Sequence, residues 1–244
     1  MQKAIDINAD LGEGYCHDDS IMPLISSCNI ACGGHYGDEN SIIKALHLAK
    51  KYKVKVGAHP SYPDREGFGR KTLNISGQEL IDSLLSQLRL MDSLCEKNDV
   101  VLNHVKLHGA LYNVATIDEE VSRAVLEALL IFDKKIEIYV PYHSVLHHLV
   151  KGTFPVKFEA FIDRRYNDDG NLVHRSHQNA LIRDPKTAWK QLFQIYKNSS
   201  VTSVQGKEIV VHAGTFCIHG DQENAVEILE YIHTELKRNK IRLC

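Results

Sequence analysis

Short runs of apolar and β-branched residues alternate along the chain with longer segments whose apolar residues recur at three- and four-residue spacing. The runs are typical of β-strands, and the longer spacing is typical of amphipathic helices. In the first run, Ile5 and Ile7 alternate with Asp6 and Asn8, so one face of that strand is polar. The pattern predicts strands at residues 3–8, 28–32, 53–58, 100–107, 136–140, 156–162 and 208–212.

Helices are predicted between these strands, and several carry recognisable start signals. Ser76 and Glu79 form a capping-box pattern, Asp38 precedes a second apolar stripe, and Pro185 stands near the start of a third. The predicted helices cover residues 39–52, 76–97, 118–132, 145–150, 185–197 and 224–238, with a short helical turn at 18–26.

Regular alternation of strands and helices indicates parallel strands joined by right-handed crossovers. No Pro- or Ser-rich linker and no change of composition divides the 244 residues, a length close to the roughly 250 residues typical of an α/β barrel. We therefore predict a protein of the α/β class with one domain, residues 1–244. That domain is a seven-stranded parallel β/α barrel of the TIM-barrel-like kind.

The most informative stretch is residues 103–113, which we interpret as a strand that ends in a loop. His104, Lys106 and His108 share one face of it, whereas a buried parallel strand is normally apolar on both faces. A single histidine there is often a hydrogen-bonded core residue. Three such groups followed by Gly109 favour the mouth of a barrel, because burying unpaired cations costs several kcal/mol.

Polar residues also follow the other predicted strands, and together they define a candidate site. A mixture of His, Asp and Lys in one concavity suits proton transfer near neutral pH. Asp10 and His59, with a second His, are candidate ligands for a divalent metal, although no tight ligand motif is present. The alternative role of Asp38 and Asp221 is to cap a helix. The alternative role of Arg164 is to form an ion pair with Asp163 or Asp169. The candidates are Asp6, Asn8, Asp10, Glu13, His35, Asp38, His59, His104, Lys106, His108, Glu159, Asp163, Arg164, His219 and Asp221.

Composition narrows the possible classes of function and location. A formal net charge of -2 without a basic run argues against nucleic acid as the main partner. No apolar run approaches the roughly 20 residues that a membrane span needs, and the first residues turn polar too soon for a signal peptide. The six cysteines include no Cys-x-x-Cys pair, so we expect free thiols and a cytoplasmic protein, with Cys28 and Cys32 in the core.

Short motifs occur in order along nearly the whole chain. They are NADLGEG at 8–14, NIACG at 29–33, GAHP at 57–60, GFGR at 67–70, HVK at 104–106, HGALYN at 108–113, DR at 163–164 with Tyr166, and HGD at 219–221. With these motifs the chain resembles the LamB/YcsF family, the A subunit of bacterial ATP-dependent 5-oxoprolinase. The resemblance implies a seven-stranded barrel related to the sugar deacetylases. It also implies ring opening of 5-oxoproline (pyroglutamate) to L-glutamate, coupled to ATP hydrolysis, in a complex with subunits B and C.

The chain lacks both a Gly-x-x-x-x-Gly-Lys-Ser/Thr loop and a kinase signature. We therefore expect ATP to be bound by the partner subunits, which would activate the lactam for hydrolysis here. In this scheme Asp10 or His59 is the general base, Lys106 and His108 stabilise developing negative charge, and Arg164 holds the substrate carboxylate. The other residues assigned to substrate binding are Asn8, Glu13, His35, His104, Asp163 and His219.

Two other functions compete with this one. The first is a free-standing, metal-dependent amide or ester hydrolase, which the mixture of Asp and His supports. The second is a non-catalytic binding subunit. It is supported by a short loop after Glu13 and by Gly214, which stands where the family pattern often has an acidic residue and which we expect near the mouth.

Overall fold

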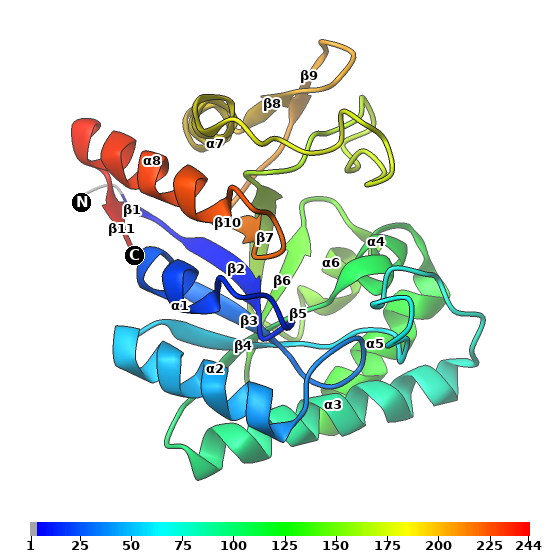
Figure 1. Ribbon diagram of the computed structural model, residues 1–244. Coiled ribbons are helices and arrows are strands. Elements are labelled where there is room, and N and C mark those ends of the chain that lie inside the picture. The colour runs from blue at the N-terminus through cyan, green and yellow to red at the C-terminus, as the bar shows by residue number, and fades with distance from the viewer. Residues whose placement is uncertain (1–3) are drawn as a thin grey trace.

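Parallel strands close into a barrel in the computed structural model, which describes residues 4–244. Within those residues the barrel has seven strands in the order β10-β2-β3-β4-β5-β6-β7, with helices packed around the outside (Figure 1). This confirms the predicted fold class. The strands are β2 (Ile7–Leu11), β3 (Ser27–Ala31), β4 (Lys55–His59), β5 (Leu102–Lys106), β6 (Glu137–Pro141), β7 (Val156–Phe161) and β10 (Thr215–His219).

The long helices begin at the predicted signals. Asp38 caps α2 in a capping box with Ser41, and Ser76 with Glu79 caps α3. Their apolar stripes pack between the helices and the barrel, so local capping and burial specify the same elements. The helical segments are α1 (Asp18–Ile21), η1 (Met22–Leu24), α2 (Glu39–Tyr52), α3 (Gly77–Lys97), α4 (Gly109–Ile117), α5 (Glu119–Phe132), α6 (Val145–Val150), α7 (Pro185–Asn198) and α8 (Ala225–Arg238).

The predicted seventh barrel strand, residues 208–212, is wrong. β9 (Glu208–Val210) pairs antiparallel with β8 (Ser200–Thr202) outside the barrel, and its side chains alternate between exposed and buried. The barrel strand is β10, which follows directly and is almost completely buried. The alternation of β9 fits a two-stranded surface pair, whereas the apolar run of β10 fits a strand covered on both faces.

Two further boundaries differ from the prediction. The first predicted strand, 3–8, is divided: β1 (Ala4–Ile5) pairs with β11 (Arg242–Leu243), and β2 enters the barrel, while Lys3 lies outside the described residues. The stretch after His108 is the helix α4 and not a loop. We missed it because no side chain caps it, and its stability comes from the burial of Ala110, Leu111 and Tyr112.

Alternate strand residues point into the barrel, and most of them are polar. At the lower end, where the strands begin, Asp6 accepts hydrogen bonds from Ser27 and Thr215. Asp6 was expected at the mouth with Asp10, and this placement is wrong because the strand is short and Asp6 precedes it. Gly214 also lies at the lower end, against the side chain of Lys157, so it does not lie near the mouth.

The middle layer of the barrel interior is filled by two amides and an aromatic pair. His104 Nε2 donates to Asn29 Oδ1 at 2.8 Å, and the imidazole stacks on Tyr139 with ring centroids 4.0 Å apart. Gly57 provides the space, since a Cβ there would lie 2.2 Å from His104 Nε2. Asn29 in turn donates to both Asn8 and Asp10. This layer connects the lower end to the upper end, where the strands finish.

Candidate active site

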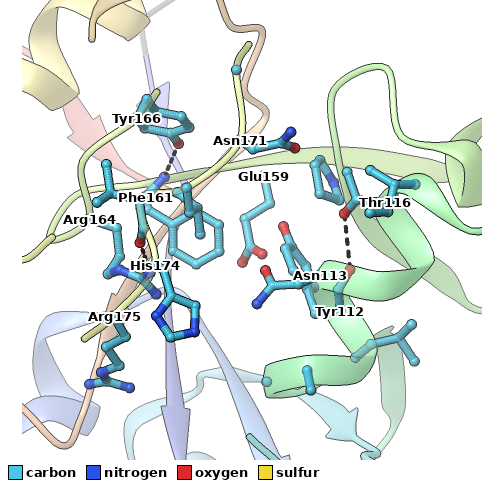
Figure 2. Close-up of a pocket in the computed structure, with 18 of the residues that line it drawn as sticks. Tyr112, Asn113, Thr116, Glu159, Phe161, Arg164, Tyr166, Asn171, His174 and Arg175 are labelled. Atoms are coloured by element: carbon cyan, nitrogen blue, oxygen red, sulfur yellow. Dashed lines mark hydrogen bonds between the residues drawn. The ribbon is translucent and has the colours of Figure 1, made fainter. Parts of the chain in front are cut away.

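A cavity of about 730 Å³ opens at the upper end of the barrel. Its floor consists of residues at the ends of β2, β4, β5, β7 and β10, and its walls come from α4 and from residues 169–175. Figure 2 shows Tyr112, Asn113 and Thr116 on one side, with Arg164, Tyr166 and His174 on the other. Catalytic sites of β/α barrels lie at this end of the strands.

Lys106 is the buried cation at the centre of the floor. Its Nζ lies 2.8 Å from Asp10 Oδ1 and 3.1 Å from Glu159 Oε1, with Cys217 Sγ at 3.0 Å. Burial alone would lower the pKa of Lys106, but the carboxylates of Asp10 and Glu159 hold it well above its usual value. Lys106 is therefore an ammonium group at neutral pH, and it can stabilise negative charge that develops in the cavity.

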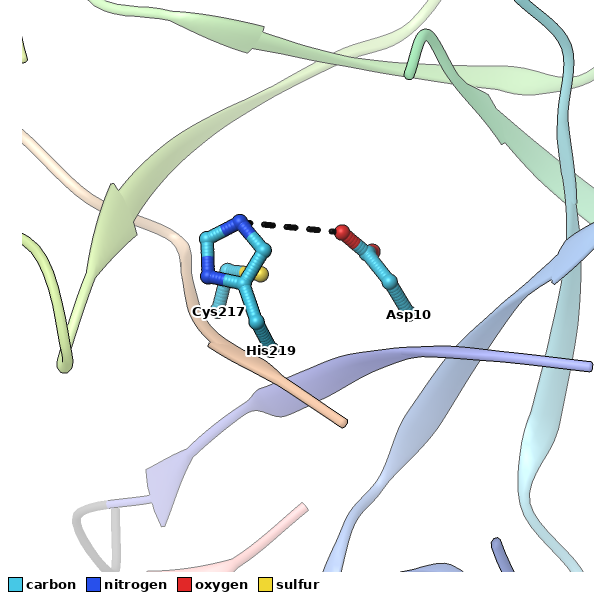
Figure 3. A group of neighbouring side chains, drawn as sticks. All are labelled: Asp10, Cys217 and His219. Carbon is cyan, nitrogen blue, oxygen red and sulfur yellow. Dashed lines mark ion pairs between the residues drawn. The ribbon is translucent and has the colours of Figure 1, made fainter. Parts of the chain in front are cut away.

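Asp10 connects the lysine to two histidines. Its Oδ2 lies 3.4 Å from His59 Nε2 and 4.0 Å from His219 Nε2, and Figure 3 shows the contact with His219 beside Cys217. Burial opposes ionisation of Asp10, yet the charges of His59 and Lys106 hold its pKa well below its usual range. The carboxylate thus stays ionised and orients the surrounding donors.

Three histidines lie around Glu13, next to Asp10. Glu13 Oε1 lies 3.0 Å from His35 Nε2, 3.2 Å from His108 Nδ1 and 3.8 Å from His59 Nε2. His35 stacks on His108 with parallel rings and centroids 3.6 Å apart. Burial lowers the pKa of His35 to about 4 despite its hydrogen bond with Glu13, so this imidazole is neutral at physiological pH.

The protonation of His59 and His108 follows from their hydrogen bonds. His59 Nδ1 donates to the carbonyl of Lys106 at 2.8 Å, and His108 Nε2 donates to the carbonyl of Phe68 at 3.0 Å. Carbonyl oxygens only accept, so the remaining nitrogens, His59 Nε2 and His108 Nδ1, face each other at 3.0 Å with lone pairs unless a positive charge lies between them. Burial lowers the pKa of His108 and so disfavours a shared proton, and a bound cation is the alternative.

The remaining predicted binding residues have different surroundings. Asp163 is fully buried beside His219, just after the end of β7, and accepts from the backbone N and from Nδ1 of His219, which turns His219 Nε2 toward Asp10. Arg164 lines the cavity and donates to the carbonyl of Val173, and among residues 4–244 it forms no ion pair with Asp163 or Asp169. Asn8 and His104 lie in the middle layer, beneath the residues that line the cavity.

Asp38 caps a helix, which was its alternative role, but Asp221 does not. Asp38 accepts from the backbone of Ser41. Asp221 instead pairs with Arg70 and Arg175 at the rim of the cavity.

Sequence reasoning missed Tyr112 as a site residue because the segment was taken for a loop. Tyr112 lines the cavity from α4, and the same reasoning left Glu159 without a role, although it contacts Lys106 on the floor. The apolar period of residues 110–115 could have identified the helix.

Two groups of side chains offer ligand atoms for a metal, each group with atoms within 4.8 Å of one another. Asp10, Cys217 and His219 do not fit a cation, because Lys106 already occupies that position and burial raises the pKa of Cys217 well above its usual value, keeping it a thiol. Glu13, His35 and His108 fit a divalent ion better. A cation there would replace the proton that His35 Nε2 donates to Glu13. A carbonyl accepts from the far nitrogen of His108 and of the neighbouring His59, an arrangement that orients metal-binding histidines.

The fold and the floor residues together define a β/α-barrel protein with a mixed carboxylate, histidine and lysine site at the carboxyl ends of its strands. Residues 5–244 match the LamB/YcsF family, and the chain belongs to that family.

Named relatives and a solved structure match almost the entire chain. It is 41% identical to the 5-oxoprolinase A subunit of Campylobacter jejuni subsp. doylei, covering 98% of this chain and 96% of that protein. It is 38% identical to the 5-oxoprolinase A subunit of Haemophilus influenzae, and the match covers 99% of each chain. The crystal structure of a lactam utilization protein from Thermus thermophilus aligns with a TM-score of 0.91 at 36% identity, covering 98% of both chains. Among residues 4–244, none of the helices has both the length and the hydropathy to cross a membrane.

Proposed function

We propose that this chain is the A subunit of an ATP-dependent 5-oxoprolinase and that its barrel carries out the hydrolytic step. The observation that carries the proposal is the buried Lys106–Asp10 pair beside the His59–His108 pair, on the floor of a cavity large enough for a small ring. The relatives that are named as this subunit of 5-oxoprolinase and the solved lactam utilization protein support the choice of substrate.

The reaction adds water to a lactam carbonyl and breaks the C–N bond. Asp10 Oδ2 and His59 Nε2 lie 3.4 Å apart on the cavity floor, so a water bound beside both can lose its proton to either group. The Lys106 ammonium and His108 stabilise the negative charge that develops. Arg164, at the opposite wall, holds the substrate carboxylate.

ATP activation belongs to the partner chains in this proposal. A lactam is a poor electrophile. Transfer of the terminal phosphoryl group of ATP to its oxygen, with release of ADP, gives an iminium phosphate that keeps the ring N–H and has an electrophilic ring carbon. Water adds to that carbon, the ring nitrogen takes up a proton and leaves as the amine, and hydrolysis of the remaining acyl phosphate by a second water releases inorganic phosphate. This chain lacks a phosphate-binding glycine loop, so we assign that step to subunits B and C of a cytoplasmic complex, which pass the activated ring to this cavity.

The test is turnover of 5-oxoproline by the reconstituted complex. With Asp10→Asn we expect at least an approximately 100-fold loss of turnover, because the variant removes the carboxylate that faces the water. Asp6→Asn is the matched control, since it changes the same face of the same segment at the lower end of the barrel. Undiminished turnover with Asp10→Asn would remove Asp10 from the mechanism.

A metal-dependent amide or ester hydrolase is a second candidate, favoured by the possible ligand atoms of Glu13, His35 and His108, with His59 beside them. A divalent ion there would supply a Lewis acid and lower the pKa of a bound water. Elemental analysis of the purified chain, together with an ATP-free amide hydrolysis assay, distinguishes the two candidates. One metal ion per chain with ATP-independent turnover would favour this second function.

The third candidate, a non-catalytic binding subunit, loses one of its two supports. Gly214 packs against Lys157 at the lower end, so its missing acidic group does not affect the cavity. A complex without this chain, restored by the wild-type chain but not by His108→Ala, would argue against a purely binding role.

A further inference from the structure

Three buried polar atoms at the cavity have no hydrogen-bond partner among the residues that the structure describes. They are Glu159 Oε2, the Tyr112 hydroxyl and Arg164 Nε. The three side chains are 2%, 7% and 7% exposed, and all of them line the cavity. A buried polar atom without a partner costs about 1–3 kcal/mol, so a cluster of three indicates a place where a ligand completes the bonding.

The donor and acceptor character of these atoms defines the ligand. Glu159 Oε1 already accepts from Asn8 at 2.9 Å and contacts Lys106 at 3.1 Å, which leaves Oε2 as a free acceptor. Burial and the neighbouring Glu159 carboxylate raise the pKa of Tyr112 well above its usual value, so the phenol keeps its proton. In Figure 2 the carboxyl group of Glu159 and the hydroxyl of Tyr112 point toward the same region of the cavity.

An apolar surface lies beside these polar atoms. The ring of Phe161 packs edge-on against Tyr112 with centroids 5.8 Å apart, and Lys106 Nζ lies 5.4 Å from the centre of the Phe161 ring. A small saturated ring can rest against Phe161 and present an N–H to Glu159. Arg164 then binds the carboxylate on the neighbouring ring carbon, because the ring nitrogen and the carbon that carries the carboxylate are adjacent in a cyclic amino acid.

We propose that Glu159, supported by Tyr112, is the specificity-determining residue that accepts the ring N–H of a cyclic amide. The inference rests on the proposed function and adds to it the reason why the site takes a lactam and not a lactone of the same shape. A lactone presents a ring oxygen to Glu159 Oε2, and two acceptors facing each other in a buried site repel. Asp10 and Glu13 do not serve this purpose, because basic side chains already surround both.

The experiment compares 5-oxoproline with its γ-lactone analogue, 5-oxotetrahydrofuran-2-carboxylate, in the reconstituted complex. For the wild type we expect the inhibition constant of the lactone to exceed the Michaelis constant for 5-oxoproline by about 100-fold. Glu159→Gln keeps an oxygen for Asn8 and places an NH₂ donor at the free position. The Michaelis constant for 5-oxoproline should rise by about 100-fold and the lactone should bind more tightly than before. Glu137→Gln, the same change on the inward face of β6 at the lower end, should alter neither constant.

Two additional measurements keep the test decisive if Glu159→Gln does not fold. Wild-type complex should bind N-methyl-5-oxoproline at least about 30-fold more weakly than 5-oxoproline, because the methyl group removes the N–H. Tyr112→Phe should reduce the preference for lactam over lactone by about 5- to 10-fold while keeping all charges.

The outcomes separate this inference from the proposed function. A wild-type complex that does not hydrolyse 5-oxoproline refutes the proposed function, and the subsite is then tested by calorimetric titration of the full chain with the same lactam and lactone. Turnover with an unchanged preference for lactam in Glu159→Gln overturns the subsite alone. Equal binding of N-methyl-5-oxoproline and 5-oxoproline by the wild type also overturns it.

Discussion

Among residues 4–244, Lys106 and Lys157 each lie inside the barrel between two carboxylates, and the two lysines differ in their further surroundings. At the lower end, Lys157 Nζ lies 3.1 Å from Glu137 and 3.8 Å from Asp6. At the upper end, Lys106 Nζ lies 2.8 Å from Asp10 and 3.1 Å from Glu159. Asp10, Lys106 and Glu159 line the cavity, whereas Lys157 does not. Polarity inside a barrel is therefore a poor guide to function by itself.

The two clusters also differ in burial. The side chain of Lys157 is 18% exposed and tolerates loose pairing, while that of Lys106 is 2% exposed and makes close contacts. Each cluster leaves one carboxylate oxygen without a hydrogen-bond partner among residues 4–244, Asp6 Oδ2 at the lower end and Glu159 Oε2 at the upper end. Only Glu159 lines the cavity, so the upper cluster is the one that suits a site that receives a ligand.

The largest expected effect comes from substituting the two lysines in turn. Lys106→Arg retains the charge but displaces the donor, and we expect turnover of the reconstituted complex to fall by at least about 1,000-fold. Lys157→Arg should change turnover by less than about 3-fold, because it contacts no cavity residue. Circular dichroism of both variants verifies that they fold. Similar losses in the two variants would break the contrast between the ends.

The next effect concerns the His59–His108 pair. His108→Gln removes one of the two facing nitrogens and, with it, the imidazole that we expect to stabilise developing negative charge. We expect turnover to fall by about 100-fold with little change in KM, as for a group that acts mainly in the transition state. His47→Gln, on the outer surface of α2, is the control. A rise in KM without a loss of kcat would instead assign His108 to ground-state binding.

A pH effect on stability should originate at the upper end. His35 has a pKa of about 4 in the folded chain because of burial, below the roughly 6.5 of an unfolded histidine. The unfolded chain therefore binds more protons between these values, and stability present above pH 6.5 is lost as the pH falls. This residue alone should lower the free energy of unfolding by about 2 kcal/mol between pH 7.5 and pH 5.

Urea titrations at the two pH values measure this effect. His35→Gln should remove about 2 kcal/mol of the pH dependence, and His47→Gln should leave it intact. An unchanged pH dependence in His35→Gln would show that burial of this imidazole does not control the response.

The smallest effect is expected at the rim of the cavity. Asp221 pairs with Arg70 and Arg175, whose side chains are 39% and 28% exposed. Partly exposed pairs contribute about 0–1 kcal/mol, so Asp221→Asn should change the KM by less than about 5-fold. A larger change would extend the recognition surface from the floor to the rim.

Much of the fold could be predicted because local signals agreed with the tertiary structure. The capping boxes at Asp38 and Ser76 and the stripes that follow them specified where α2 and α3 begin. The error at the seventh strand arose because Glu208–Val210 alternates like a half-buried strand, while β10 is recognisable only from its burial. The helix α4 was missed because tertiary packing, and not a cap, stabilises it.

The candidate site could be predicted only where the alternation of side chains along a strand was sufficient to place a residue. Asp10 and Lys106 lie on the inward faces that alternation predicted, and the structure places them 2.8 Å apart. The approach of Cys217 to Lys106 depends on the register of β10 against β2, which no local pattern reveals. The position of Tyr112 depends in the same way on how α4, whose start no side chain caps, packs against the barrel.

The central claim is that the floor of this cavity adds water to a lactam that the partner subunits have activated. Its most direct test is a single-turnover experiment with the reconstituted Asp10→Asn complex, in which ADP and L-glutamate are measured in the same samples. We predict that 5-oxoproline-dependent ADP still forms while L-glutamate falls by at least about 100-fold. Formation of L-glutamate at the wild-type rate would contradict the claim and move the hydrolytic step out of this barrel.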